Sequence, residues 1–473
     1  MTLQTFSVRS RTRLAGLAVA ALLSTAAAAQ VATPLVTGPI PAVGPPGTDL
    51  TRNYPQLASE PNFDLSRRGY IEEEFFFEGT ATRYSTPTMA NGVVISTGHP
   101  YKTRMIVRRP AEAAKFNGIV IVEWVNVTAG YNLDLHWETS REYLTREGYA
   151  YVGVSAQRVG VQQPPYGLTA WSPTRYGTLD VTAGGTITND SLSYDIFSQA
   201  GQAIRGRPEL LGGLRPLMLL AVGASQSAQR LTLYYNSIEP LHHVYDGYLL
   251  HILGGPFRTD IRTKLLRINT ENEIAVLNQA AIRQPDSNTF RSWEIAGASH
   301  VGYWFMMYRM QLVARDALAP SNFSCDKPPL SHIPTMYVLN AGYDHLVDWV
   351  RTGRKPPQAE PIQVTSTSPL VIPRDANGHV FGGIRLATID VPTATNTGVN
   401  SGASFCILYG SHEPFGPAKV AALYPTHDSY VHAVRQVAHR NVREGFVLEE
   451  DAKEIIRDAR DSRVGTPNPL PIP

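Results

Sequence analysis

Ser225 lies where the sequence can present a serine hydroxyl as a nucleophile. It is the middle residue of Gly223-Ala-Ser-Gln-Ser227, which follows the apolar run Leu217–Val222 and precedes a helix-compatible stretch over 228–235. A buried strand, a tight turn and a helix in this order raise a serine hydroxyl above the sheet and place a helix N-terminus beside developing negative charge. Ser227 replaces the usual second glycine with another small residue. The segment therefore predicts a nucleophilic Ser225.

A serine hydroxyl needs a base to accept its proton, and His300 is the histidine that the sequence favours. It ends the loop Gly297-Ala-Ser-His300, which follows the last predicted strand, Ser292–Ala296. Of the 13 histidines, it is the one that follows a strand downstream of the predicted nucleophile. We expect most of the others to be surface or packing residues, and we predict that His300 is the base.

Two glutamates compete for the acid that orients the imidazole. Glu271 and Glu273 directly follow the strand predicted over Leu265–Thr270. We favour Glu273, because the acid usually lies a few residues beyond its strand. Glu271 remains the alternative, since a glutamate reaches about one bond further than an aspartate. Nucleophile, acid and histidine then follow one another in the order that is typical of the α/β-hydrolase fold.

Backbone N–H groups must stabilise the oxyanion that forms when a serine attacks a carbonyl. The residue after the nucleophile, Gln226, supplies one such group in this kind of turn, and a loop after the third strand supplies the second. That loop is Val125-Asn-Val-Thr-Ala-Gly-Tyr131. We predict Val127 as the second donor because it closely follows the end of the strand.

The elements that must position these residues alternate between apolar runs and longer polar or amphipathic stretches. This pattern predicts an α/β fold, namely an α/β-hydrolase fold with a mostly parallel eight-stranded sheet and helices on both faces. The predicted strands are Glu73–Gly79, Tyr101–Val107, Gly118–Trp124, Ala150–Ala156, Leu217–Val222, Gly247–His251, Leu265–Thr270 and Ser292–Ala296.

The chain divides into four predicted parts. Residues 1–29 have the basic, apolar and small-residue regions of a signal peptide, so we expect a periplasmic or extracellular protein. A Pro/Gly-rich leader over 30–60 precedes the hydrolase core, 61–310, and residues 311–473 form a C-terminal extension or helical cap. The Pro- and Gly-rich insertion at about 160–190 is a candidate lid. Four aromatic residues could line the pocket, although ordinary packing is the commoner role for such residues near a cap, namely Tyr166, Trp171, Tyr303 and Trp304.

Composition limits the classes of partner. The 42 Lys and Arg residues are balanced by 40 Asp and Glu, so no strong field gathers nucleic acid or an anionic membrane. We expect no nucleic-acid partner and no stable membrane insertion. The sequence has no phosphate-binding glycine loop and no CxxC or Cys/His cluster, so we expect neither a metal nor an organic cofactor. It does not indicate an oligomeric state.

Two cysteines, Cys325 and Cys406, occur in the chain. An even number in an exported protein permits a disulfide, and two free buried thiols are the alternative. We predict the disulfide, whose loop of about eighty residues contributes roughly 4 kcal/mol in the chain-entropy model.

Six segments resemble a bacterial family of exported α/β-hydrolase-domain proteins, and the resemblance extends over nearly the whole mature chain. Members often have Glu-x-Asp where this sequence has Glu271-Asn-Glu273, which leaves the choice of acid open. The matching segments are Gly118–Asn132, Gly148–Arg158, Ala221–Leu231, Asn269–Ile274, Gly297–Val301 and Phe381–Pro392.

The predicted residues together indicate an exported serine hydrolase that cleaves a carboxylic ester, small or oligomeric, through an acyl-enzyme. The same groups could serve a secreted peptidase, a lactonase or an acyltransferase. A non-catalytic binding protein of the same fold is an alternative from a different class.

Overall fold

The computed structural model of the chain describes residues 1–2, 31–48, 51–58 and 63–466. Nearly all of the predicted signal peptide, 1–29, lies outside the described residues. Among the helices of the described part, none combines the length and the apolar character that a bilayer crossing requires.

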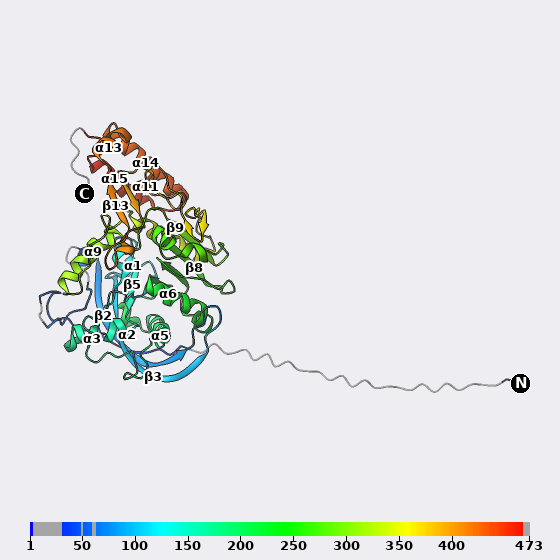
Figure 1. The fold of residues 1–473 in the computed structure, drawn as a ribbon. Coiled ribbons are helices and arrows are strands. Elements are labelled where there is room, and N and C mark those ends of the chain that lie inside the picture. Colours follow the sequence, from blue (N-terminus) through cyan, green and yellow to red (C-terminus); the bar gives the residue numbers. More distant parts are fainter. Residues whose placement is uncertain (3–30, 49–50, 59–62, 467–473) are drawn as a thin grey trace.

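A nine-stranded sheet forms the centre of the fold, in the order β1-β2-β3-β5-β4-β6-β7-β8-β9 (Figure 1). Strands β5, β4, β6, β7, β8 and β9 pair in parallel, and β1, β2 and β3 pair antiparallel at one side. This confirms the predicted mostly parallel α/β sheet. The strands are β1 (Leu35–Thr37), β2 (Tyr70–Tyr84), β3 (Val94–Pro110), β4 (Ile119–Trp124), β5 (Ala150–Val154), β6 (Met218–Ala224), β7 (Gly247–His251), β8 (Lys264–Thr270) and β9 (Phe290–Ile295).

All eight predicted strands are present in the central sheet, and β1 is the ninth strand of that sheet. It comes from the segment predicted as a leader and pairs with Phe76, Phe77 and Glu78 of β2. Three residues of mixed exposure carry no hydrophobic pattern from which a strand could be predicted.

Helices cover both faces of the sheet. Gly342 of α10 lies against Leu249 of β7, whereas the next residue, Leu250, lies on the side of Gly254 and Thr232. Adjacent residues of a strand point to opposite faces, so α10 and α6, which contains Thr232, cover opposite faces. The longer helices of the first 315 residues are α1 (Leu135–Arg146), α5 (Ser193–Gly206), α6 (Gln226–Leu233) and α9 (Tyr303–Arg315), with the short α7 (Glu239–His242) and α8 (Glu271–Ala275) between them.

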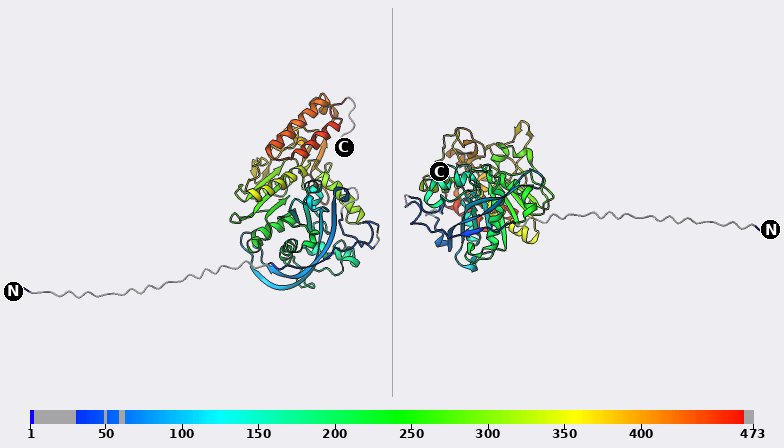
Figure 2. Two further views of the ribbon diagram at one scale, coloured as in Figure 1. Left: turned by 180° about the vertical axis from the view of Figure 1, so that it is seen from behind. Right: turned by 90° about the horizontal axis from the view of Figure 1, so that it is seen from below.

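The last third of the chain contributes to the core and also forms a helical piece at one end of the molecule. Helix α10 packs against β7 and β8, although it lies beyond residue 310, where the predicted hydrolase core ends. Helices α13 to α15 gather at the end opposite β2 and β3, around a small cluster of their own that includes Val431 and Val434 (Figure 2). The elements are α10 (Thr335–Thr352), α11 (Ala387–Asp390), α12 (Cys406–Tyr409), α13 (Pro417–Leu423), α14 (His427–Glu444), α15 (Glu449–Asp461), β10 (Ser366–Thr367), β11 (Leu370–Val371), β12 (Ala394–Thr397) and β13 (Ser411–Pro414).

The insertion at about 160–190 contains the short helices α2 (Arg158–Gln162), α3 (Leu168–Trp171) and α4 (Pro173–Tyr176). It is fixed to the sheet by a buried network in which Arg175 donates to Glu74 of β2 at 2.6 Å and Tyr176 donates to the same carboxylate at 2.7 Å. Arg104 of β3 also pairs with Glu74. Buried ion pairs that are broken on one side are strongly destabilising, so this network holds the insertion in place.

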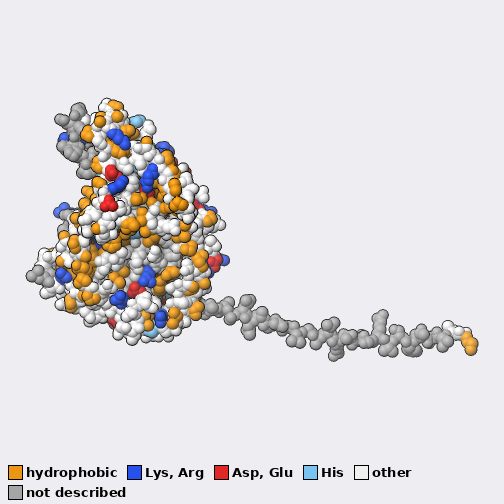
Figure 3. Space-filling model, in the orientation of Figure 1, with side chains coloured by type: hydrophobic (Ala, Val, Ile, Leu, Met, Phe, Trp, Pro, Cys, Tyr) orange, Lys and Arg blue, Asp and Glu red, His pale blue; other side chains and the backbone are white. Residues whose placement is uncertain are grey.

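Charged side chains on the face seen in Figure 3 are scattered among hydrophobic ones, and the two signs are mixed. This agrees with the nearly balanced charge of the sequence.

Candidate active site

Ser225 lies at the sharp turn between β6 and α6, with φ 58° and ψ −121°. A positive φ at a residue other than glycine is strained and persists only where neighbouring structure holds it. Here the Ser225 N–H donates to the carbonyl of His251, at the end of the adjacent strand β7, at 3.0 Å. The backbone of the sheet edge therefore fixes the predicted nucleophile in its turn.

Helix α6 approaches strand β6 closely just before this turn. A Cβ on Gly223 would lie 2.9 Å from the Leu231 side chain and 3.1 Å from the backbone of Ser227, so a larger residue would have to displace its neighbours. Ser227, which stands where a second glycine is usual, donates to the carbonyl of Ala224 at 2.9 Å and accepts from its N–H at 3.0 Å. The serine hydroxyl therefore ties the start of the helix to the end of the strand.

Ser225, His300 and Glu273 form a continuous chain of hydrogen bonds. Nε2 of His300 lies 2.8 Å from Oγ of Ser225, and Nδ1 lies 2.7 Å from Oε1 of Glu273. His300 and Glu273 are buried, whereas Ser225 is partly exposed. The structure thus brings together three residues that are far apart in sequence, in the order that a serine, base and acid require.

The carboxylate of Glu273 is held from both sides. Its second oxygen accepts hydrogen bonds of 2.6 Å from the N–H and the hydroxyl of Thr270, in a capping box at the start of α8. The first oxygen is thereby left to His300.

Glu271 does not reach His300. Its carboxylate accepts from the N–H of Gly297 at 3.0 Å and pairs with Arg374 at 2.7 Å. Burial raises the pKa of Glu271, and the Arg374 cation acts in the opposite direction. Of the two candidate acids, the geometry therefore places only Glu273 beside the imidazole.

The predicted oxyanion donors lie in two different segments. Gln226 opens α6, so its N–H belongs to the first turn, where helical N–H groups have no acceptor within the helix. Val127 lies in the loop after β4, which Asn126 ties to the turn by donating to the carbonyl of Ala224 at 3.0 Å. The N–H of Thr128 is already bonded to the side chain of Asn126 at 2.7 Å. Gln226 and Val127 remain predictions.

A cavity of about 150 Å³ opens beside Ser225 and His300. Its walls come from the loop after β4, the first turns of α1, the end of β7, helix α9 and two loops of the last third of the chain. The lining is mainly apolar, as small-molecule sites usually are. It includes Leu133, Phe305, Leu408 and Tyr409.

The four aromatic residues that could have lined the pocket do not do so. Tyr166, Trp171, Tyr303 and Trp304 are absent from the lining of this cavity. Trp171 instead donates to the carbonyl of Asp316 at 2.8 Å within the core. The whole insertion is likewise absent from the lining, because it is fixed over β2 and β3 and not over the predicted nucleophile.

The sequence did not indicate His251, which also lines the cavity. Burial, and to a lesser extent the neighbouring His136 and His300, lowers the pKa of His251 well below its usual value. It therefore stays neutral and adds no second cation beside His300. Burial likewise lowers the pKa of His136 to about 4.

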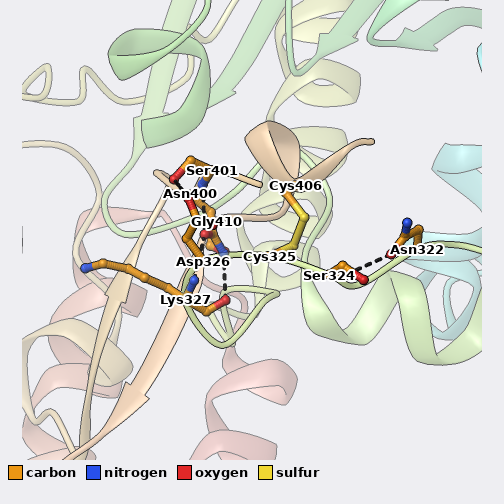
Figure 4. Close-up of a disulfide and its surroundings, with 9 residues drawn as sticks. All are labelled: Asn322, Ser324, Cys325, Asp326, Lys327, Asn400, Ser401, Cys406 and Gly410. Atoms are coloured by element: carbon orange, nitrogen blue, oxygen red, sulfur yellow. Dashed lines mark hydrogen bonds between the residues drawn. A yellow bond between two sulfur atoms is a disulfide. The ribbon is translucent and has the colours of Figure 1, made fainter. Parts of the chain in front are cut away.

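A disulfide joins Cys325 to Cys406, which are 81 residues apart (Figure 4). This confirms the predicted bond. The two loops that it connects carry cavity residues on either side, among them Asn322 and Phe405. The bond therefore fixes two parts of the cavity wall to one another.

The comparisons with known proteins agree with this architecture. Residues 36–457 match the family described as "Alpha/beta hydrolase domain", so the chain belongs to the α/β-hydrolase family. Comparison with curated proteins found no match.

Solved structures resemble the chain only distantly. A dienelactone hydrolase from Anabaena variabilis ATCC 29413 is 15% identical over 50% of this chain and 94% of its own, with a TM-score of 0.28. A serine hydrolase without a lid from Xanthomonas campestris is 13% identical over 51% and 97%, with a TM-score of 0.27. A Geobacillus stearothermophilus carboxylesterase is 15% identical over 38% of this chain and only 35% of its own length, with a TM-score of 0.22. Scores this low carry no argument about the site.

Proposed function

We propose that this protein is a serine hydrolase that cleaves carboxylic esters through an acyl-enzyme. The observation that carries the proposal is the hydrogen-bonded chain from Ser225 through His300 to Glu273, at 2.8 Å and 2.7 Å, at the wall of a mainly apolar cavity. A hydroxyl that is bonded to an imidazole, which is itself oriented by a carboxylate, is the arrangement that activates a serine for attack.

In the first half of the reaction, Oγ of Ser225 attacks the ester carbonyl while Nε2 of His300 accepts the hydroxyl proton. Glu273 stabilises the imidazolium through Nδ1 and does not itself take the proton. The tetrahedral oxyanion is stabilised by backbone N–H groups, for which we propose Gln226 and Val127. Collapse breaks the bond to the alcohol oxygen, which leaves with the proton from His300.

In the second half, water replaces the alcohol. His300 accepts a proton from the water as it attacks the acyl-enzyme, and then returns that proton to Oγ of Ser225 as the second tetrahedral intermediate collapses. The products are the free acid and a regenerated serine. No step calls for a redox change or for a group other than the ester and water.

Peptide, lactone and transfer chemistry use the same three residues and are the nearest alternatives. The small apolar cavity favours an ester with a compact group, because an apolar cavity of about this size holds one benzene-sized group. A panel of esters, lactones and peptides, assayed with wild-type protein and Ser225→Ala, tests the proposal. Ester turnover that is lost in a folded Ser225→Ala variant supports it, and turnover that persists near the wild-type rate contradicts it.

A non-catalytic binding protein of the same fold has no need for a strained serine that is bonded to a buried histidine. A binding protein is therefore the second candidate function. It would be favoured if folded wild-type protein hydrolysed none of the esters, lactones and peptides in the panel.

We further propose that the protein is exported to the periplasm or the outside of the cell. The Cys325–Cys406 bond supports this, because disulfides form and persist in oxidising compartments. N-terminal sequencing of the protein recovered from cell fractions tests it. A processed chain that begins near residue 30 in the exported fraction is expected, and an unprocessed chain confined to the cytosol contradicts it.

A further inference from the structure

Arg309 is a positively charged residue in the wall of the cavity that contains Ser225. It lies on α9 and is one of the residues that line the cavity, and only 9% of the residue is exposed. Arg315 on the same helix pairs with Asp316, whereas Arg309 forms no ion pair with a carboxylate of residues 31–48, 51–58 or 63–466. A buried cation without a counter-ion is energetically costly, so the position calls for an explanation.

Few hydrogen-bond acceptors surround this guanidinium. Its Nη2 donates to the hydroxyl of Tyr131 at 2.6 Å, and its Nε is buried with no hydrogen-bond partner among the described residues. The rings of Tyr131 and Phe305 lie 5.3 Å and 5.8 Å from its Cζ. A guanidinium has five N–H donors in a planar fork, and the Tyr131 hydroxyl is the one acceptor that the described residues supply to it.

The Arg309 cation acts on the pKa of Glu138, but the two side chains form no ion pair. Both oxygens of Glu138 are buried without a hydrogen-bond partner among the described residues. Burial first, and then Asp134, raises the pKa of Glu138 to about 8, against the opposing effect of Arg309 and two other arginines. Neither oxygen of Glu138 forms a hydrogen bond or an ion pair with Arg309, so this carboxyl group does not occupy the guanidinium.

We propose that Arg309 binds a carboxylate of the substrate, and hence that the protein prefers esters that carry a free carboxylate over neutral esters. The proposal rests on the proposed ester hydrolysis at Ser225. A guanidinium binds a carboxylate through two parallel hydrogen bonds, which fixes the orientation of the bound molecule. Leu133 and Phe305 supply apolar walls for the carbon skeleton in the same cavity. The carboxylate at Arg309 then sets where the ester lies relative to Ser225.

Matched pairs of esters test the preference, because a carboxamide has the size of a carboxylate but no charge. One pair carries the group on the acid side, monomethyl glutarate and methyl glutaramate, and the other on the alcohol side, 4-acetoxybenzoate and 4-acetoxybenzamide. We expect kcat/KM to favour the carboxylate by at least about tenfold in one of the two pairs. A ratio within about twofold of one in both pairs overturns the proposal.

Two substitutions assign the preference to Arg309. Arg309→Met should lower the carboxylate-to-carboxamide ratio by at least about tenfold, and Arg309→Lys, which keeps the charge but not the fork, should give an intermediate ratio. Arg141→Met is the matched control, since Arg141 lies against Tyr308 in the neighbouring cavity and should leave the ratio unchanged. A ratio that Arg309→Met leaves unchanged overturns the proposal. If Arg309→Met does not fold, the wild-type and Arg309→Lys ratios decide.

A binding measurement separates this proposal from the proposed function. Titration calorimetry of Ser225→Ala with benzoate and with benzamide needs no turnover. We expect benzoate to bind at least about tenfold more tightly, and Arg309→Met in the same background to remove the difference. Equal affinities overturn the anion site even if esters are hydrolysed. Tighter benzoate binding in a protein that hydrolyses no ester supports the anion site and contradicts the hydrolase.

Discussion

Glu271 and Glu273 share the first turn of α8, yet their carboxylates contact opposite ends of the loop that carries His300. Glu273 lies 2.7 Å from Nδ1 of His300, and Glu271 accepts from the N–H of Gly297, where that loop begins, at 3.0 Å. One carboxylate therefore orients the imidazole, while the other holds the loop in position together with Arg374. This division of roles makes the two glutamates separable by experiment.

Glu273→Gln should lower kcat by roughly three to four orders of magnitude, because an amide cannot stabilise the imidazolium and favours the wrong tautomer of His300. Steady-state kinetics with an ester from the panel measures the effect. The unfolding midpoint should stay close enough to the wild-type value for the variant to be assayed as a folded protein.

Glu271→Gln is the matched control and should act on stability. Removing the buried carboxylate from its pair with the partly exposed Arg374 should lower the free energy of unfolding by roughly 2 kcal/mol, while kcat changes by less than about tenfold. Denaturant unfolding and the same kinetic assay give both values. A larger loss of kcat in Glu271→Gln than in Glu273→Gln would reverse the assignment.

Glu138 should make stability depend on pH. The pKa of Glu138 is raised to about 8 in the folded protein, above its value in the unfolded chain, so the folded state holds the proton more tightly. The stabilisation that Glu138 contributes is complete below the pKa that it has in the unfolded chain, and it is lost as the pH rises from there toward about 8. The free energy of unfolding falls by no more than about 1.4 kcal/mol per pH unit over this range.

Glu138→Gln removes that dependence. We expect the variant to gain stability relative to the wild type between pH 5.5 and pH 7.5, measured by denaturant unfolding at each pH. If the difference in unfolding free energy between variant and wild type is the same at pH 5.5 and at pH 7.5, Glu138 is ionised in the folded protein throughout this range.

Reduction of the Cys325–Cys406 bond should loosen the cavity wall as well as the fold. The chain-entropy model gives about 4.5 kcal/mol for a closed loop of 81 residues, and the freed loops that carry Asn322 and Phe405 should raise KM. Kinetics and unfolding with and without reductant test this. A Cys325→Ser, Cys406→Ser double variant lacks the bond and should show no response to reductant. An unchanged KM in reduced wild-type protein would show that the bond does not shape the substrate site.

The local elements of the site could be predicted because consecutive residues encode them. The strand, turn and helix around Ser225 occupy one continuous segment, and the buried parallel strands are continuous apolar runs. The hydrogen bonds that join Ser225, His300 and Glu273 follow from the order of these elements along the sheet, where the carboxyl ends of parallel strands meet. The catalytic roles of the three residues stay predictions.

The cavity wall could not be predicted, because it depends on how distant loops pack. Aromatic residues such as Tyr166 and Trp171 are common in pocket linings, but the ion pair of Arg175 with Glu74 fixes their segment over β2. Arg309 looks in the sequence like any arginine of an amphipathic helix. Its burial at the cavity wall, without a carboxylate partner among the described residues, depends on the packing of distant segments, and no local pattern encodes that.

The site of covalent labelling by a fluorophosphonate tests the central claim most directly, because this reagent reacts only with an activated serine. Peptide mass spectrometry of the labelled protein should place a single phosphonyl adduct on Ser225. Ser225→Ala and His300→Ala should remain folded and unlabelled, since the hydroxyl is inert without its base. A folded wild-type protein that takes no label, or a label that persists on another serine in Ser225→Ala, would contradict the account.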